Sequence, residues 1–232
     1  MAECKKFKEG VPGRPGLPPP APGRCRIGSL NVQGIDGKVS KVVDLFRANH
    51  LSILGLQEVW MRPDLIEAFR AAVEKAGLIL MIDPEDCWAD AQDRAGRGVA
   101  IITSHPVSMD ANPLKEKWPG RALFARAHVK ARRPLRLGIP YCNASDERDA
   151  GKEAAAMLKH LLELDDPAFA LGDWNLVQEQ RPFASLLGKM SGGRRTTWPP
   201  MKCSTLDRPG LSTLGWVPPT LLLRWPVARW RA

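Results

Sequence analysis

Apolar residues in this chain form short segments separated by polar residues, glycine and proline. In some segments they recur at helical spacing, as at Val39, Val42, Val43 and Phe46. In others they form unbroken runs bounded by turn residues, which is typical of strands. The pattern predicts strands over 25–32, 51–59, 78–82, 98–104, 122–130, 134–141 and 168–173, and helices over 38–50, 62–77, 149–165 and 181–188.

These elements are joined by two kinds of connection. Helices link several strands, whereas 122–130 and 134–141 are separated by a short basic turn and are expected to pair as neighbours. This mixture predicts an α/β (α+β) fold in which two mixed sheets pack face to face, with helices on their outer faces. A doubly wound open sheet is the alternative, and the adjacent strands within 121–141 argue against it.

The two ends of the chain differ in composition from its middle. Residues 1–24 are basic and rich in proline and glycine, so we expect a disordered leader before Cys25. Residues 213–232 contain tryptophan, proline and arginine but no acidic residue and no clear period. We therefore expect one domain over 25–212, followed by an irregular tail that is either a basic amphipathic segment or a sequence foreign to the fold.

Charge and cysteine content narrow the classes of partner and compartment. The net charge of +9 favours polyanionic partners such as nucleic acid, an anionic membrane or a phosphorylated small molecule, although many basic domains are merely soluble. The five cysteines are scattered without a C-x-x-C motif, which favours reduced thiols over a zinc site or disulfides. Without a signal peptide or membrane-spanning run, we expect an intracellular protein of the nucleus or cytoplasm.

Polar side chains lie at the ends of four of the predicted strands. If the two sheets pack as expected, these strand ends can meet at one rim. Carboxylates beside amides at such a rim can hold Mg²⁺, which prefers one or two carboxylates together with water and substrate phosphates. Taken alone, a strand that ends in Gly-Asp-x-Asn is more often an ordinary turn. The polar residues are Asn31 and Gln33, Gln57 and Glu58, Tyr141 and Asn143, and Asp173 and Asn175.

Six motifs occur in an order that favours the metal site over the ordinary turn: LNVQG, LGLQEVW, GRGVAIITSHPV, PYCNAS, LGDWN and STLDR. In this order they resemble the endonuclease/exonuclease/phosphatase superfamily. The resemblance covers roughly residues 25–212 and is nearest to abasic-site endonucleases and to non-LTR retrotransposon endonuclease domains. It implies a four-layer sandwich with a Mg²⁺-dependent site for phosphodiester hydrolysis on one rim, with Mn²⁺ as a possible substitute.

The resemblance also implies roles for individual residues. Glu58 resembles the metal-binding glutamate, and Asn31 resembles the asparagine that supports the site beside it. Tyr141 resembles the tyrosine that contacts the phosphate. Asp173 resembles the aspartate that aligns or activates the attacking water, and Asn175 its phosphate-contacting partner.

Asp207, in STLDR, resembles the aspartate that orients a catalytic histidine, and here the chain departs from the family. The family ends in a Ser-Asp-His box, and this sequence contains none. Gln33 also stands where the family often has an acid or a second asparagine, and PYCNAS lacks the usual proline. The four histidines all precede Asp207, and none is expected to replace the missing one: His50, His105, His128 and His160.

Two functions follow from these observations. The first is a Mg²⁺-dependent nuclease that is impaired by the missing box and for which DNA is favoured over RNA as the substrate. The second is a catalytically inactive relic, or a nucleic-acid-binding module of the same fold. An inositol-phosphate or lipid phosphodiesterase belongs to the same superfamily, but no membrane helix or phosphate-binding loop supports it. No feature of the sequence indicates an oligomeric state.

Overall fold

The computed structural model describes residues 19–20, 25–86, 98–129, 133–142, 147–163 and 167–174. Most of the predicted leader and all of the predicted tail lie outside the described residues. So does the helix expected over 181–188. Three residues expected near the site are likewise not described: Asn143, Asn175 and Asp207.

The first sheet is built from β1 (Ile27–Asn31), β2 (Ile53–Gln57), β3 (Ile79–Ile82) and β4 (Val99–Thr103), in the order β1-β2-β4-β3. β1 and β2 pair in parallel, and β4 is antiparallel to both of its neighbours. Helix α1 (Val39–Ala48) makes the crossover that a parallel pair requires.

The second sheet contains β5 (Val107–Met109), β6 (Ala122–Ala127), β7 (Leu135–Pro140) and β8 (Ala168–Ala170), in sequence order. The first three strands are antiparallel, and β7 and β8 pair in parallel across helix α3 (Glu147–Leu162). We call residues 25–103 the N-terminal half and residues 107–174 the C-terminal half, because each contains the described strands of one sheet.

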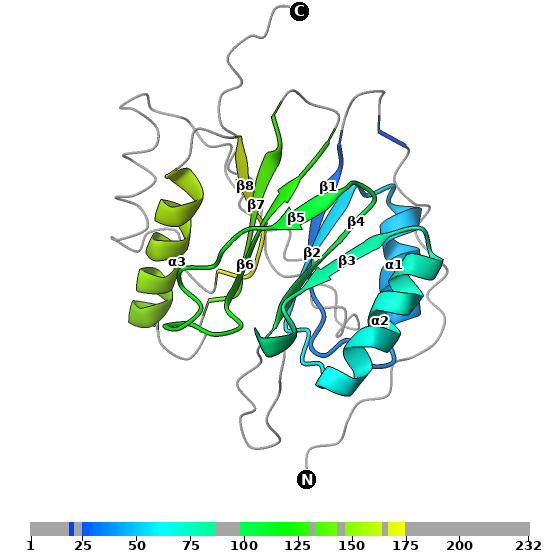
Figure 1. Ribbon diagram of the computed structural model, residues 1–232, viewed down its shortest axis with the longest axis horizontal. Helices are drawn as coiled ribbons and strands as arrows, with labels where there is room; N and C mark the ends of the chain where they lie inside the picture. The colour runs from blue at the N-terminus through cyan, green and yellow to red at the C-terminus, as the bar shows by residue number, and fades with distance from the viewer. Residues whose placement is uncertain are drawn as a thin grey trace, which may run out of the picture.

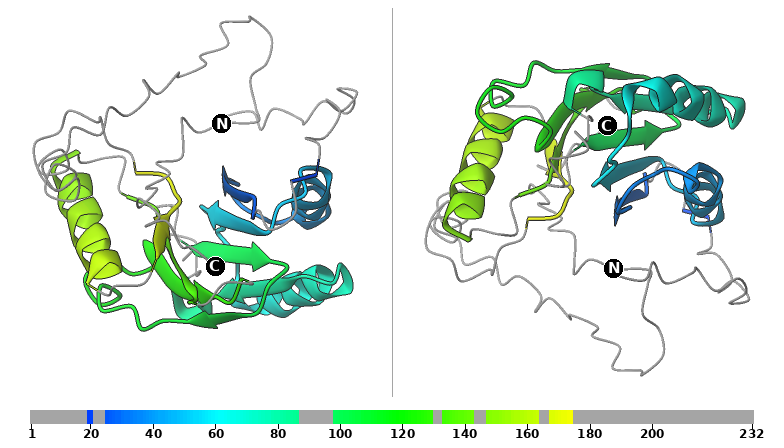
Figure 2. Two further views of the ribbon diagram at one scale, coloured as in Figure 1. Left: turned by 90° about the horizontal axis from the view of Figure 1, so that it is seen from above. Right: turned by 90° about the horizontal axis from the view of Figure 1, so that it is seen from below.

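The two sheets and the helices form four layers (Figures 1 and 2). Helix α1 and helix α2 (Pro63–Lys75) cover the outer face of the first sheet, and α3 covers the outer face of the second. The two-sheet prediction is therefore confirmed, and the doubly wound alternative is wrong. A buried apolar cluster fills the space between the sheets: Ile53, Val99, Ile101, Leu123, Ala125, Ala127, Leu135, Leu137, Ile139, Tyr141 and Leu171.

Local differences from the predicted elements have physical causes. β5 was not predicted, because it is a short edge strand whose residues are only partly covered. Nor was the 3₁₀ turn η1 (Pro84–Asp86) that follows β3. His50 lies beyond the end of α1 with a left-handed φ of 49°, and His128 lies just beyond β6 rather than within a strand. Among the helices of the described residues, none combines the length and apolar character needed to cross a bilayer.

Candidate active site

The carboxyl ends of the two parallel strand pairs carry the predicted site residues. Asn31 is the last residue of β1, and Glu58 directly follows β2. Tyr141 directly follows β7, and Asp173 lies shortly beyond β8. Each pair of residues thus comes from one half of the chain and from strands that are neighbours in a sheet.

In the N-terminal half the parallel ladder continues past the strands through left-handed backbone. The Val32 amide donates to the Gln57 carbonyl at 2.9 Å, and the Gly34 amide donates to the Glu58 carbonyl at 2.7 Å. Gln33 and Glu58 have φ values of 46° and 54°. Such values cost a non-glycine residue about 1–2 kcal/mol and persist where the surroundings hold them. The local hydrogen bonds therefore fix the direction in which Glu58 leaves the strand.

In the C-terminal half the parallel pairing resumes beyond the strands in the same register. Tyr141 and Asp173 form a parallel bridge. The Asp173 amide donates to the Pro140 carbonyl at 3.1 Å, and the Cys142 amide donates to the Asp173 carbonyl at 2.9 Å. A Cβ atom at Gly172 would collide with that Pro140 carbonyl oxygen. Glycine at 172 therefore permits the close approach that places Asp173 beside Tyr141.

Asn31 joins the two halves of the site. Its side-chain Nδ2 donates to Glu58 Oε1 at 2.6 Å and to Asp173 Oδ2 at 3.2 Å. Its Oδ1 accepts from the Gln33 amide at 3.2 Å, which fixes the orientation of the carboxamide. Two carboxylates from different sheets thus share one nitrogen donor, so the predicted convergence of Asn31, Glu58 and Asp173 is observed in the structure.

The Tyr141 hydroxyl lies at the same place and donates a hydrogen bond to the Glu58 carboxylate. Burial of the side chain, followed by the negative charge of Glu58 and this hydrogen bond, raises the pKa of Tyr141 to about 12. Asp173 raises the pKa further, and Arg121 opposes the shift. The phenol is therefore protonated at neutral pH and remains a hydrogen-bond donor.

Arg121 is a site residue that the sequence reasoning missed. Its guanidinium lies 4.9 Å from the centre of the Tyr141 ring, and its carbonyl accepts from the Tyr141 amide at 2.8 Å. A cation at this position offsets the two nearby carboxylates. Its only sequence signal is its place directly before β6, opposite the end of β7, and that pairing has to be known first.

Two of the amide side chains predicted at the rim, those of Gln57 and Gln33, do not face the site in the structure. Gln57 is buried within β2, where its Oε1 accepts from the Ser29 hydroxyl at 3.1 Å. Gln33 is exposed and contacts Asn31 through its backbone rather than its side chain. Gln57 therefore stabilises the β1–β2 pair and does not face a ligand.

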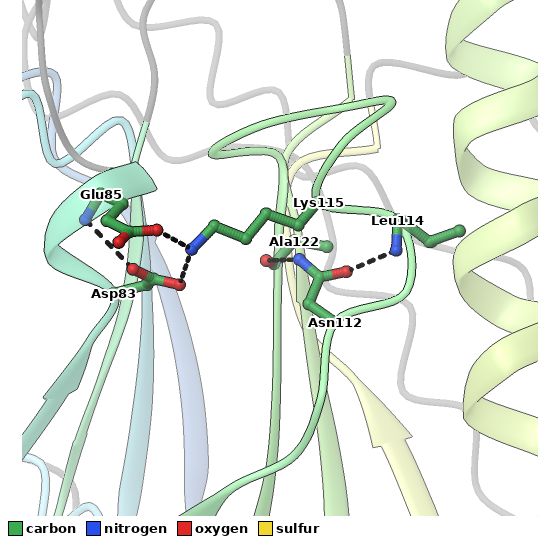
Figure 3. A network of polar contacts seen from close by, with 6 residues as sticks. All are labelled: Asp83, Glu85, Asn112, Leu114, Lys115 and Ala122. Carbon is green, nitrogen blue, oxygen red and sulfur yellow. Dashed lines mark hydrogen bonds and ion pairs between the residues drawn. The ribbon is translucent and has the colours of Figure 1, made fainter.

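A group of ion pairs and hydrogen bonds, which we call the brace, connects the two halves after the end of β3 and before the start of β6 (Figure 3). Lys115 Nζ contacts Asp83 Oδ2 at 2.7 Å and Glu85 Oε2 at 2.8 Å. The Asn112 side chain closes the loop that carries Lys115, because its Nδ2 donates to the Ala122 carbonyl at 2.9 Å and its Oδ1 accepts from the Leu114 amide at 3.0 Å. The brace connects η1 of the N-terminal half with the loop that leads into β6.

The donor set at the rim fits a hydrated divalent cation. Within the described residues no three acidic, histidine or cysteine side chains form a cluster that could enclose a metal ion. Mg²⁺ does not need such a cluster, because it keeps several waters and is commonly held by one or two carboxylates and substrate phosphates. Glu58 and Asp173, brought together by Asn31, provide two carboxylates at a partly exposed rim.

Comparison with known proteins agrees with this architecture. The sequence pattern of the Endonuclease/Exonuclease/phosphatase family matches residues 28–231. No curated protein matches the chain. An AP endonuclease from Archaeoglobus fulgidus has a similar structure, with a TM-score of 0.54 and 17% identity over 72% of this chain and 71% of that one.

Two structures of a Neisseria protein are also similar. One is a variant of the 3′ phosphatase NExo from Neisseria bound to a product DNA hairpin, with a TM-score of 0.54 and 17% identity over 71% of this chain and 70% of that one. The other is the 3′-5′ exonuclease NExo from Neisseria meningitidis, with a TM-score of 0.53 and 18% identity over 69% of this chain and 70% of that one. At these identities the likeness concerns the fold.

Proposed function

Because the chain belongs to the endonuclease/exonuclease/phosphatase family, we propose that it hydrolyses phosphodiester bonds of nucleic acid with the help of Mg²⁺. One observation carries the proposal: the Asn31 side chain joins the Glu58 and Asp173 carboxylates across the two sheets. A structural role alone does not require two carboxylates from different sheets to meet at a partly exposed rim, where their charges repel.

Glu58 is the proposed ligand of the metal, and Asn31 positions it. A bound Mg²⁺ supplies positive charge that polarises a phosphate oxygen. Mn²⁺ suits the same oxygen donors and is expected to substitute. The left-handed backbone at Glu58 and the hydrogen bond from Asn31 hold the carboxylate in place before any ligand arrives.

Asp173 and Tyr141 are proposed to handle the water and the phosphate. Asp173 orients the attacking water and accepts its proton, as a carboxylate within hydrogen-bonding reach can. Tyr141 keeps its proton at neutral pH, and its single O–H, which donates to Glu58 in the free site, would instead donate to a phosphate oxygen of a bound substrate. Asn175 is proposed to contact the phosphate beside Asp173, and Asp207 retains the supporting role implied by its motif; both lie outside the described residues.

Nucleic acid is the proposed substrate because the chain is basic and because a protein of similar fold was seen bound to DNA. The net charge of +9 and the basic stretches KARRPLR and GGRRTTW favour a polyanion, since neutralising backbone phosphates drives such binding. Among proteins of similar fold, one was seen with a product DNA hairpin. We therefore propose DNA ahead of RNA.

Cleavage is proposed to be slow. The sequence has no Ser-Asp-His box, and the four histidines lie elsewhere: His50 precedes β2, His105 follows β4, His128 follows β6, and His160 belongs to α3. A positioned acid, base or electrostatic group contributes about a hundred- to ten-thousand-fold to rate. Arg121 supplies positive charge near Tyr141 but no proton at neutral pH, so it replaces only part of this contribution.

Nicking of supercoiled plasmid tests the proposal. The chain is compared with Glu58→Gln in Mg²⁺ and in EDTA, and Glu67→Gln on α2, which removes the same charge from an exposed side chain, is the matched control. We expect slow Mg²⁺-dependent nicking that Glu58→Gln abolishes and Glu67→Gln preserves. Plasmid binding is expected to stay nearly unchanged in both variants, because losing an anion does not weaken attraction to an anion. Nicking that survives Glu58→Gln would overturn the proposal.

The absence of a Ser-Asp-His sequence favours one second function, a catalytically inactive module that binds nucleic acid. In that case the same plasmid is bound, the affinity falls steeply with salt, and no nicks accumulate in Mg²⁺. Rapid Mg²⁺-dependent nicking would contradict both this alternative and the expected impairment.

A further inference from the structure

Trp60 is an exposed aromatic side chain beside the candidate active site. It lies two residues after Glu58 and is 39% exposed, whereas Val59 and Met61 on either side of it are buried. An indole ring in this position places a large apolar surface in water, which is unfavourable unless the ring has a partner for part of the time.

The backbone at Trp60 is held in an unusual conformation. Trp60 has a φ of 42°, in the left-handed region that bulky residues rarely adopt. Hydrogen bonds of the preceding Val59 fix the segment, because its amide donates to the Gly98 carbonyl at 3.0 Å and its carbonyl accepts from the Ile35 amide at 3.0 Å. The exposed ring is therefore presented by a fixed support, which reduces the entropy lost on binding.

Gly34 provides the space in which the ring edge lies. A Cβ atom built on Gly34 would be 3.5 Å from Trp60 Cε3, so the indole packs beside the glycine backbone with no side chain between them. The adjoining loop is tied together by Lys38, whose Nζ donates to the Val32 and Gln33 carbonyls at 2.7 Å and 2.9 Å. An exposed aromatic face on such a support, close to the proposed phosphate site, suits the base of a nucleotide.

We propose that Trp60 stacks on a nucleobase next to the phosphate bound at Glu58, Tyr141 and Asp173, and so favours substrates with an unpaired base at that position. This inference rests on the proposed function, because the nucleic-acid substrate of that function supplies the base that Trp60 would contact. An unpaired base has a free face for the indole, whereas a base inside a duplex already stacks on its neighbours on both sides.

Binding of labelled oligonucleotides in EDTA tests this inference without requiring cleavage. One oligonucleotide is single-stranded DNA, and the second has the same length and backbone but abasic sites in place of nucleosides. Trp60→Ala is expected to weaken binding of the first by about 5- to 100-fold and to leave binding of the second unchanged. Trp60→Phe, which keeps an aromatic face, is expected to restore most of the affinity.

Ile79→Ala is the matched control, because Ile79 is 40% exposed and lies at the start of β3, paired with Thr103 at the opposite end of the first sheet. It is expected to leave both affinities unchanged. Equal losses on the two oligonucleotides in Trp60→Ala, or no loss on either, would overturn the inference. A loss caused by misfolding would appear in the circular dichroism spectrum and would affect both oligonucleotides alike.

The inference and the proposed function can fail separately. If Trp60→Ala binds normally while Glu58→Gln abolishes Mg²⁺-dependent nicking, the stacking role is wrong and the hydrolase stands. If no nicking occurs but the Trp60→Ala loss depends on the bases, the hydrolase is wrong and the stacking surface stands.

Discussion

The N-terminal and C-terminal halves present their site residues in the same place by different means. Both use the carboxyl end of a parallel pair, β1–β2 in one half and β7–β8 in the other. In the N-terminal half, Glu58 leaves the strand through left-handed backbone fixed by hydrogen bonds. In the C-terminal half, Asp173 keeps the register of the strand pair, and Gly172 allows the two chain segments to approach.

This difference indicates which kind of substitution each half tolerates least. The N-terminal half depends on backbone conformation and on polar contacts, which lose strength gradually when they are altered. The C-terminal half depends on empty space next to a backbone carbonyl, which cannot move away as a flexible side chain can. Substitutions of comparable size should therefore have unequal effects in the two halves.

Gly172→Ala is expected to cause the largest loss of stability. Its methyl group would collide with the Pro140 carbonyl, so we expect a loss of at least about 3 kcal/mol in the free energy of unfolding. Gly55→Ala is the matched change in the N-terminal half, where a Cβ would lie 2.8 Å from Ile139 Cδ1, a side-chain end that can shift. We expect a loss of about 1–2 kcal/mol there. Urea unfolding measures both, and equal losses would refute the comparison.

The link between the halves is tested by Asn31→Asp and Asn31→Ala. Either change removes the hydrogen bonds to Glu58 and Asp173, at an expected cost of about 1–3 kcal/mol in metal-free protein. Only Asn31→Asp adds a third carboxylate, which should tighten binding of a divalent cation. Thermal unfolding with and without Mg²⁺ should therefore show a larger Mg²⁺-induced rise in Tm for Asn31→Asp than for Asn31→Ala. The same response in both would contradict the proposed cation site.

The pKa of Tyr141, in the C-terminal half, responds to the negative charge of Glu58 in the N-terminal half. It is the only tyrosine, so the ultraviolet absorbance of tyrosinate follows this residue alone. We expect a midpoint near pH 12 in the folded chain and near 10 in denaturant, and a lower midpoint in folded Glu58→Gln. The unfolded chain releases this proton first, so stability should fall as the pH rises from about 10 towards 12. A midpoint near 10 in protein shown by circular dichroism to be folded would contradict the expected burial.

Lys115→Met is expected to have the smallest effect. It removes the brace to Asp83 and Glu85 but keeps most of the side-chain volume. Because Lys115 and Glu85 are partly or largely exposed, the expected loss is about 0.2–1 kcal/mol, and it should shrink in high salt. Lys152→Met is the control, since Lys152 pairs with Asp149 within α3 and does not connect the halves. Urea unfolding at two salt concentrations measures this effect, and a loss that does not respond to salt would argue against an ionic brace.

Much of this arrangement could be predicted from the sequence because the strands are strongly patterned. The mostly apolar runs of β2 and β4 identify buried strands, and polar residues at or just beyond the strand ends identify Asn31, Glu58 and Asp173 as residues of one rim. Their order in motifs then indicated the family, which the match over residues 28–231 shows.

The other features of the site depend on strand pairing and backbone conformation, which the pattern of a single sequence does not encode. Gln57 and Glu58 are adjacent polar residues, yet one is buried in the sheet and the other faces the site, because the backbone turns left-handed at Glu58. Arg121 gains its role only from the register that places it opposite Tyr141. A charged residue before a strand is otherwise typical of any surface turn.

The separation of the sheets along the chain has a consequence for synthesis on the ribosome. Among the described residues, the strands of the first sheet lie within 27–103 and those of the second within 107–170, so these strands of the first sheet can pair before those of the second begin to emerge. Until then the inward face of the first sheet, which carries Ile53, Val99 and Ile101, has no partner layer. We therefore expect a stage of synthesis at which this apolar face is exposed and open to a chaperone, until the second sheet docks on the first.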